Sequence, residues 1–320
     1  MPRLVIRLPN HLGDACMALP ALELLQAAGL ELALAGPPWS RDLFAAYPWR
    51  VTALPGQRLA RIAALRALRA AQGRDGLLLT HSFSSALEFR LAGLRAIGYA
   101  RDARGWLLRQ SVPVPAQWRG DMHTIDYYLH LARTALRDLQ PAQALPEPAP
   151  AVPRLRVAAQ AERQAAQALA QPAAGGGAAQ DYVVLCPIAR GRHEGRDKRW
   201  DGFARLGREL RAQGARVVIC PGPGELAAAS AAVPEAERVG PLDVGAFAAL
   251  LARSRLVVAN DSGPGHLAAA VGARLVGVFG VTDPAKTCPR GPNVRIVGGA
   301  RGWPRYEEVA ELARAALAGA

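Results

Sequence analysis

Short apolar runs alternate with longer amphipathic segments along the chain, and most runs end in a polar or glycine-containing loop. Apolar, β-branched runs predict buried strands, and apolar positions three or four residues apart predict helices. In the first half we expect strands at 3–8, 32–35 and 76–80, and helices at 15–28 and 59–71. In the second half we expect strands at 182–186, 216–220, 256–259 and 274–279, and helices at 202–213, 224–232, 244–253 and 265–271. This alternation predicts an α/β protein with two doubly wound, Rossmann-like domains.

A proline-rich stretch at residues 140–153 separates the two series and suits a semi-rigid linker. We therefore expect one domain at 1–150 and another at 151–320, facing each other across a cleft between the carboxyl ends of their sheets. Residues 173–180 include three successive glycines and predict a surface loop. A last predicted helix, residues 305–318, has no strand after it.

At residues 257–270 the chain passes directly from a predicted strand into a predicted helix. Asp261 or Ser262 can cap this helix, and the free N–H groups of its first turn can bind an anion. Gly263 and Gly265 let the backbone come close to a bound phosphate. A phosphorylated ligand and a well-capped helix without a ligand fit these residues about equally well.

A second loop, residues 9–14, follows the first predicted strand, at the sheet edge where ligands bind in such folds. Asp14 can accept a proton from a substrate hydroxyl if it faces the cleft. The other interpretation is that Asp14 only occupies the first helical turn, where a negative charge suits the helix dipole. The loop by itself favours that second interpretation.

The chain is basic, with a formal net charge of +13, and only two of its 39 basic residues are lysines. Arginine forks suit carboxylates and phosphates, so an acidic partner is expected: nucleic acid, an anionic membrane or a charged small substrate. The charge is spread over both halves and no nucleic-acid motif is visible, so the charge supports such a partner only weakly.

The cysteines and histidines show no metal-ligand spacing. Scattered single cysteines favour a reduced, cytosolic chain. No apolar run is long enough to predict a membrane-spanning helix.

Several segments, taken in order, resemble the heptosyltransferases of lipopolysaccharide core synthesis, glycosyltransferase family 9. They are residues 9–14 with 18–22, residues 82–87, 92–93 and 97–99, then His123, Tyr127, residues 186–187, 198–200, 260–266 and 279–284. The similarity extends over nearly the whole chain. It is greatest to the heptosyltransferase II type, whose loop also reads proline, two residues, a hydrophobe, glycine and aspartate.

The resemblance implies a GT-B fold, an ADP-heptose donor and an inverting transfer that uses no metal and no cofactor. It places the donor in the C-terminal domain and the acceptor in the N-terminal domain. Asp14 is then the base for the acceptor hydroxyl, and Lys198 with the start of the helix at 262–266 stabilises the departing diphosphate.

The donor-binding residues that the resemblance implies lie in both domains. They are Asn10, His11, Gly13, Pro187, Glu225, Leu242, Asp261, Ser262, Gly263 and His266. Glu225 matches a ribose-binding carboxylate and Leu242 a hydrophobe against adenine, although an exposed helix-start glutamate and a core leucine would look the same. His266 is expected to contact phosphate or heptose, the alternative being a core histidine. Residues 188–197 depart from the family pattern, so their contacts are left open.

The acceptor is expected to be lipid A-linked core oligosaccharide, met at the cytoplasmic face of the inner membrane by peripheral contact. Arg58, Arg61, Arg66 and Ser82 are the expected acceptor-binding residues, although the arginines also suit a solvated helix face. The last helix is expected to pack back on the N-terminal domain. Two other functions remain open: another sugar-nucleotide-dependent GT-B transferase or epimerase, and a nucleotide- or nucleic-acid-binding module without catalysis. The resemblance implies that the chain does not bind nucleic acid.

Overall fold

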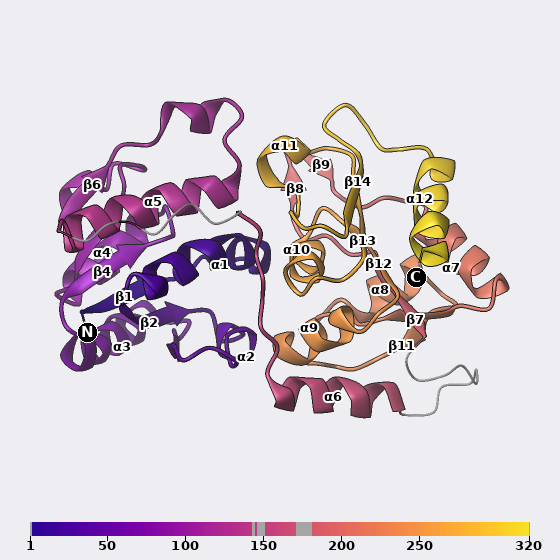
Figure 1. The fold of residues 1–320 in the computed structure, drawn as a ribbon, viewed down its shortest axis with the longest axis horizontal. Helices are drawn as coiled ribbons and strands as arrows, with labels where there is room; N and C mark the ends of the chain where they lie inside the picture. Colours follow the sequence, from indigo (N-terminus) through magenta and orange to yellow (C-terminus); the bar gives the residue numbers. More distant parts are fainter. Residues whose placement is uncertain (1, 143–144, 146–150, 171–180, 320) are drawn as a thin grey trace. The chain divides into compact units, whose positions relative to one another are not determined.

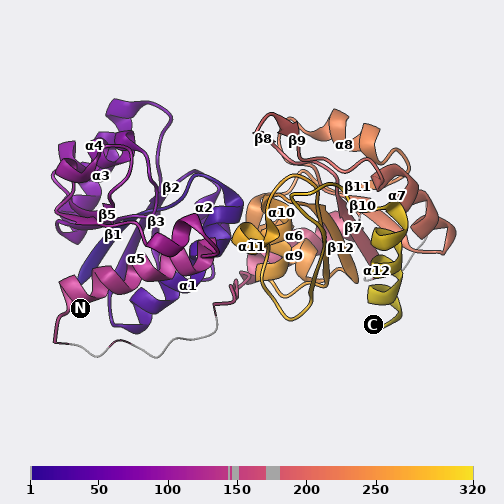
Figure 2. The same cartoon turned by 90° about the horizontal axis from the view of Figure 1, so that it is seen from above.

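The chain divides into two compact units, Met1–Ala151 and Val152–Ala320 (Figures 1 and 2). This computed structural model describes residues 2–142, 145, 151–170 and 181–319. The loop expected at 173–180 lies outside the described residues, as does most of the central part of the linker expected at 140–153. The cleft expected between the domains stays a prediction.

The first unit is built on a six-stranded parallel sheet with the strand order β3-β2-β1-β4-β5-β6. The strands are β1 Arg3–Arg7, β2 Glu31–Gly36, β3 Arg50–Ala53, β4 Asp75–Leu78, β5 Arg95–Tyr99 and β6 Gln110–Val112. In the centre, Val5 pairs with Ala33 on one side and with Gly76 on the other. Leu4, Val5 and Ile6 are fully buried because helices cover both faces of the sheet, which explains the unbroken apolar run.

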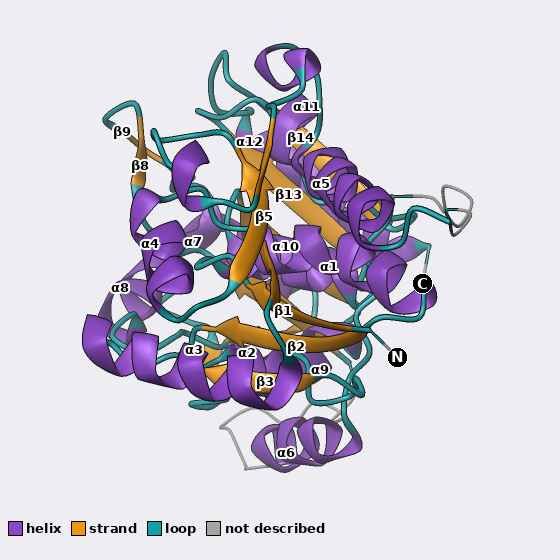
Figure 3. Ribbon diagram, turned by 90° about the vertical axis from the view of Figure 1, so that its left-hand side faces the viewer, coloured by secondary structure: helices purple, strands orange, loops and turns teal. Residues whose placement is uncertain are grey.

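Helices cover both faces of this first sheet (Figure 3). They are α1 Leu12–Ala27, α2 Ser40–Leu43, α3 Arg58–Gln72, α4 Phe83–Leu91 and α5 Thr124–Leu139. One face packs against α3 and α4, where Leu65 and Phe89 meet Val5 and Ala33 in the core. The helices α1 and α5 pack against each other on the opposite face.

The second unit repeats the same plan with the strand order β11-β10-β7-β12-β13-β14. Its parallel strands are β7 Tyr182–Cys186, β10 Arg216–Ile219, β11 Glu237–Arg238, β12 Leu256–Asn260, β13 Leu275–Phe279 and β14 Val294–Gly298. A separate antiparallel pair is formed by β8 Arg192–His193 and β9 Arg196–Asp197. The helices are α6 Ala159–Ala170, α7 Phe203–Ala212, α8 Leu226–Ala232, α9 Val244–Ala252, α10 Gly263–Ala270, α11 Pro284–Thr287 and α12 Tyr306–Ala318.

The last helix, α12, packs on the sheet of the second unit, and its expected contact with the N-terminal domain stays a prediction. Its buried side chains Val309, Ala310 and Ala313 lie in one core with Val258 and Val276 of the second sheet. The apolar stripe of α12 is therefore covered by the sheet of its own unit, together with α7 and α8.

Both sheets have the doubly wound strand order, which confirms the predicted fold class. In each sheet the order of the strands reverses beside the first strand, between β1 and β4 and again between β7 and β12. Ligands of such folds bind at this reversal, outside the carboxyl ends of the strands. A ligand-binding site is therefore expected in the loops after these four strands.

Candidate active site

In the second unit, Asn260 joins the loops at the reversal between β7 and β12. Its side chain is buried, its Nδ2 donates to the Pro187 carbonyl at 2.7 Å, and its Oδ1 accepts from the Trp200 N–H at 3.0 Å. A buried amide with both ends bonded holds its neighbours firmly. Asn260 therefore fixes the position of the segment that carries Lys198, two residues before Trp200.

Lys198 is held by an ion pair at this reversal. Its Nζ lies 2.7 Å from Oδ2 of Asp261, and the hydroxyl of Thr282 donates to the same oxygen at 2.8 Å. The side chains of Lys198 and Asp261 are only 19% and 9% exposed. The ammonium is thus kept directly before α10, while three donors on one nitrogen leave hydrogens for a second acceptor.

The start of α10 is not capped by either residue expected to cap it, which corrects that expectation. Ser262 is the residue before the helix, but its hydroxyl donates to the Asn260 carbonyl at 3.1 Å and makes no capping bond. The Asp261 carboxylate is occupied by Lys198 and Thr282. Because no side chain of these two covers the N–H groups of the first turn, this end of α10 suits an anion. His266 lies in the first helical turns and is 7% exposed.

Glu225 and Leu242 lie in the loops after β10 and β11. Glu225 accepts from Nε of Arg190 at 2.5 Å and, through its other oxygen, from the Gly222 N–H at 3.0 Å. Its side chain is 21% exposed, so it differs from the exposed helix-start glutamate of the alternative interpretation. Leu242 is half-buried, which leaves part of its surface open. Arg190 comes from the segment 188–197, whose contacts the sequence left open.

In the first unit, Asp14 lies in the first turn of α1 and is half-buried. His11 precedes the helix in an extended conformation and is exposed, whereas Gly13 is buried. Burial raises the pKa of the Tyr128 hydroxyl, and the charge of Asp14 raises it further. The charge of Asp14 therefore acts on Tyr128 of α5.

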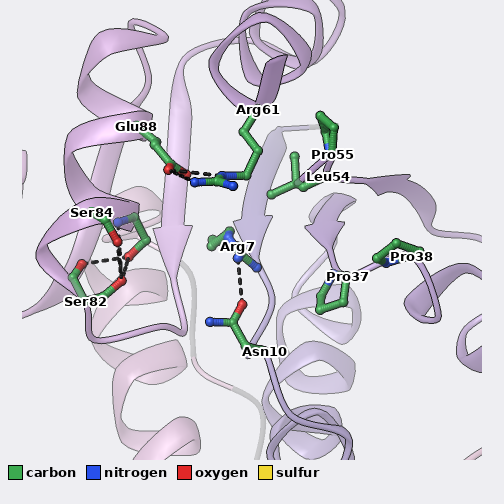
Figure 4. A pocket seen from close by; sticks show the side chains of 11 residues that line it. Arg7, Asn10, Pro37, Pro38, Leu54, Pro55, Arg61, Ser82, Ser84 and Glu88 are labelled. Carbon is green, nitrogen blue, oxygen red and sulfur yellow. Dashed lines mark hydrogen bonds and ion pairs between the residues drawn. The ribbon is translucent and has the colours of Figure 1, made fainter. Parts of the chain in front are cut away.

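A cavity of about 350 Å³ lies at the reversal of the first sheet (Figure 4). Its lining comes from the loops after β1, β2, β3 and β4 and from α3 and α4. The lining residues are Arg7, Asn10, Pro37, Pro38, Leu54, Pro55, Arg61, Ser82, Ser84, Ser85 and Glu88.

Of the residues expected to bind acceptor, the structure brings Arg61 and Ser82 into this cavity. Arg66 is exposed, and its guanidinium donates to the Leu91 carbonyl at 3.2 Å. Arg58 begins α3 and is also exposed. Asn10, expected to bind donor, also lines this cavity.

Arg7 and Glu88 line the cavity and were not singled out by the sequence. The available signal was weak: Arg7 is a charged residue at the end of an otherwise apolar run, and Glu88 lies on a helix with little amphipathic character.

No three His, Cys, Asp or Glu residues gather in a metal-binding group within the described part of the chain. Over the same residues, no helix is both long and apolar enough to cross a membrane.

Comparison with known proteins identifies a family. The model of glycosyltransferase family 9 (heptosyltransferase) matches residues 61–314. Lipopolysaccharide heptosyltransferase 3 of Escherichia coli is 33% identical over 117 residues, and this match spans a third of the length of each chain.

Solved structures share the fold of the chain. The E. coli ADP-heptose lipopolysaccharide heptosyltransferase II has a TM-score of 0.77 at 23% identity, covering 100% of this chain and 99% of that one. A family 9 glycosyltransferase of Veillonella parvula has a TM-score of 0.81 at 17% identity, covering 100% and 98%. The E. coli heptosyltransferase WaaC with ADP has a TM-score of 0.73 at 19% identity, covering 98% and 99%. With the family model matched over most of its length, the chain belongs to glycosyltransferase family 9, the heptosyltransferase family.

Proposed function

We propose that this chain is an inverting glycosyltransferase that moves heptose from ADP-heptose to the inner core of lipopolysaccharide. The observation that carries the proposal is the Lys198–Asp261 ion pair, 2.7 Å long, directly before the uncapped start of α10. A fixed cation beside a helix N-terminus suits the diphosphate of a sugar nucleotide. Membership of family 9 and the heptosyltransferases among the solved relatives support the choice of ADP-heptose.

The second unit is the proposed donor-binding domain. Lys198 and the start of α10 bind the diphosphate and stabilise the charge that develops as ADP leaves. Asp261 orients Lys198, and His266 contacts phosphate or heptose. Glu225 receives the ribose hydroxyls and Leu242 packs against adenine. Because Lys198 and the helix supply the positive charge, the proposed step needs no metal.

The first unit is the proposed acceptor-binding domain, with Asp14 as its base. In an inverting displacement one base takes the proton of the attacking hydroxyl, and the nucleotide leaves from the opposite face of the sugar. Asp14 suits this role because its carboxylate is held on the first turn of α1, after the central strand β1.

The acceptor that we propose is lipid A-linked core oligosaccharide, met at the cytoplasmic face of the inner membrane. The net charge of +13 supports this, because it attracts the chain to an anionic surface and to an anionic acceptor. The contact is peripheral, made by a chain that resides in the cytoplasm.

A sugar-nucleotide screen tests the proposal. The purified chain is incubated with ADP-heptose, ADP-glucose, UDP-glucose or GDP-mannose, with and without heptose-deficient lipopolysaccharide, and the released nucleoside diphosphate is measured. We expect release from ADP-heptose alone, and only in the presence of acceptor. Release from another sugar nucleotide would instead identify a different GT-B transferase.

A further inference from the structure

Arg190 joins two loops of the second unit that follow neighbouring strands. It lies in the loop after β7, whereas its partners Pro223 and Glu225 lie after β10. Its Nε donates to Oε1 of Glu225 at 2.5 Å, and its Nη2 donates to the Pro223 carbonyl at 2.7 Å. One planar guanidinium therefore holds both the carboxylate and the backbone of the loop that carries it.

The Glu225 side chain is turned back toward its own loop. Glu225 is the residue before α8, yet its side chain makes no capping bond to that helix. Its Oε2 accepts instead from the Gly222 N–H at 3.0 Å. Each carboxylate oxygen thus has one protein donor and keeps a second acceptor site. Two such sites on one oriented carboxylate suit the two neighbouring hydroxyls of a ribose.

The ion pair contributes little to the stability of the fold. The side chain of Arg190 is 68% exposed and that of Glu225 is 21% exposed. Exposed pairs gain little because water screens the charges and because ordering two long side chains costs entropy. Residues 190–197 are all exposed, so Arg190 does not support the core. A role in ligand binding therefore accounts better for a guanidinium held here by two bonds.

We propose that Arg190 is a positioning residue that orients the Glu225 carboxylate toward the ribose of the bound nucleotide, and so makes the chain select ribonucleotides over 2′-deoxyribonucleotides. The inference rests on the proposed function in taking Glu225 as the ribose-binding carboxylate. Without Arg190 the carboxylate is free to rotate, and ordering it then costs part of the binding free energy. Arg190 also balances the charge of Glu225, which otherwise repels the diphosphate of the same ligand.

The segment that carries Arg190 leads directly to Lys198. Near that end Arg196 donates to the Val281 carbonyl at 3.0 Å, and Lys198 pairs with Asp261. The segment is thus fixed beside Glu225 at one end and beside the proposed diphosphate site at the other. One continuous stretch of chain is therefore placed to serve the ribose and the diphosphate of one nucleotide.

The affinities for ADP and 2′-deoxy-ADP test the proposal without a sugar donor or turnover. Titration calorimetry measures both. We expect wild type to bind ADP about tenfold more tightly, because 2′-deoxy-ADP lacks one hydroxyl for the oriented carboxylate. Arg190→Gln should weaken the binding of both nucleotides and reduce the ratio of their affinities to about twofold. Its Tm should stay close to that of wild type, because the pair is exposed.

Two further variants separate the charge of Arg190 from its positioning role. Arg190→Lys keeps the charge but lacks the fork that reaches both Glu225 and the Pro223 carbonyl. It should bind 2′-deoxy-ADP as wild type does, with a reduced ratio. In Gly222→Ala the added Cβ would lie 3.0 Å from Oε2 of Glu225, which moves the carboxylate aside without changing any charge. The ratio should fall in this variant too.

A matched control is the ion pair between Arg205 and Glu209 on α7. It joins the same two atoms, Nε and Oε1, at 3.0 Å, and its side chains are 54% and 42% exposed. Arg205→Gln should leave the binding of both nucleotides unchanged. A double-mutant cycle completes the test: once Glu225→Ala has removed the carboxylate, adding Arg190→Gln should not alter the ratio further.

Direct contact of Arg190 with a phosphate would weaken the binding of both nucleotides equally in Arg190→Gln and keep the ratio of wild type. That result would overturn the proposal, as would equal affinity of wild type for the two nucleotides. Failure of wild type to bind either nucleotide would contradict the proposed function and this inference together. A chain that discriminates between them but transfers no heptose contradicts the proposed function alone, whereas heptose transfer without discrimination contradicts only this inference.

Discussion

Lys198 and Asp261 form an ion pair in which Nζ lies 2.7 Å from Oδ2, although 62 positions separate them along the chain. Lys198 comes directly after β9, and Asp261 directly after β12. The carboxylate is fixed a second time by the Thr282 hydroxyl at 2.8 Å. The pair therefore places one oriented ammonium before α10.

Replacing Lys198 by alanine should weaken ADP binding and lower kcat together, because the cation acts on both the bound and the departing diphosphate. We expect losses of about 10- to 100-fold in each. Titration calorimetry with ADP and initial rates with ADP-heptose measure them. Arg208→Ala, an exposed cation on α7, is the matched control. Unchanged ADP affinity in Lys198→Ala would place Lys198 away from the phosphates.

A double-mutant cycle tests whether Asp261 acts through Lys198. Asp261→Asn keeps the shape and an acceptor for Thr282 but removes the charge that holds Lys198. We expect Asp261→Asn to lower kcat, and the double variant with Lys198→Ala to be scarcely worse than Lys198→Ala alone. Additive losses would show that Asp261 contributes by a separate route.

Replacing Asp14 by asparagine should remove the base while keeping the size of the side chain. We expect kcat to fall by roughly 10²–10⁴-fold, with ADP affinity little changed because the nucleotide belongs to the other unit in our proposal. Pre-steady-state rates and calorimetry separate the two quantities. Near-normal turnover of Asp14→Asn would remove this residue from the mechanism.

Among the three arginines of α3 expected to bind acceptor, Arg61 should matter most. Arg61 alone lines the cavity, whereas Arg58 is exposed and Arg66 donates to the Leu91 carbonyl. Arg61→Gln leaves Glu88 without its counter-ion, so an anionic acceptor should be repelled and its KM should rise about tenfold or more. The affinity for ADP should be unchanged in Arg58→Gln, Arg61→Gln and Arg66→Gln. Equal effects of these three variants on the acceptor KM would contradict this prediction.

His81 should make the folded state sensitive to acid. Burial lowers its pKa to about 4, helped by the charges of Arg101 and Arg104, and its Nδ1 is buried without a hydrogen-bond partner among the described residues. The unfolded chain therefore binds the proton more tightly. The stabilisation is complete above pH 6.5 and is lost as the pH falls from there towards 4, by up to about 3 kcal/mol.

Thermal unfolding of wild type and His81→Gln across this pH range isolates the contribution of His81, since other titrating groups are common to both. We expect the Tm of wild type to fall more steeply below pH 6.5 than that of His81→Gln. Parallel curves would show that His81 takes up a proton as easily in the folded chain as in the unfolded one.

Sequence patterns of a few neighbouring residues predicted the strands and helices that carry the site residues. The strand before Asn260 and the helix after Ser262 were predicted within a few residues, because an apolar, β-branched run and an alanine-rich segment specify them. The alternation of strands with helices predicted the doubly wound fold class, but the strands β3, β5, β6, β11 and β14 were not predicted. Asp14 lies in the first turn of α1, as one of its two interpretations had it, although the helix was predicted to begin only at residue 15.

Contacts between distant residues were beyond the reach of such patterns. Arg7 and Glu88 share a cavity because β1 and α4 meet at the reversal of the sheet, and nothing in either segment predicts the other. The bond from Arg190 to Glu225 depends on two loops that the sequence does not relate. The packing of α12 on the sheet of its own unit was not predicted for the same reason: its apolar stripe does not say which surface covers it.

The most direct test of the central claim is the product itself. Wild-type protein is incubated with ADP-heptose and heptose-deficient lipopolysaccharide, and the product is analysed by mass spectrometry and by NMR of the new anomeric proton. Our account predicts one added heptosyl group per acceptor, an equal amount of released ADP, and an anomeric configuration opposite to that of the donor. Unmodified acceptor, or a product that retains the configuration of the donor, would contradict it.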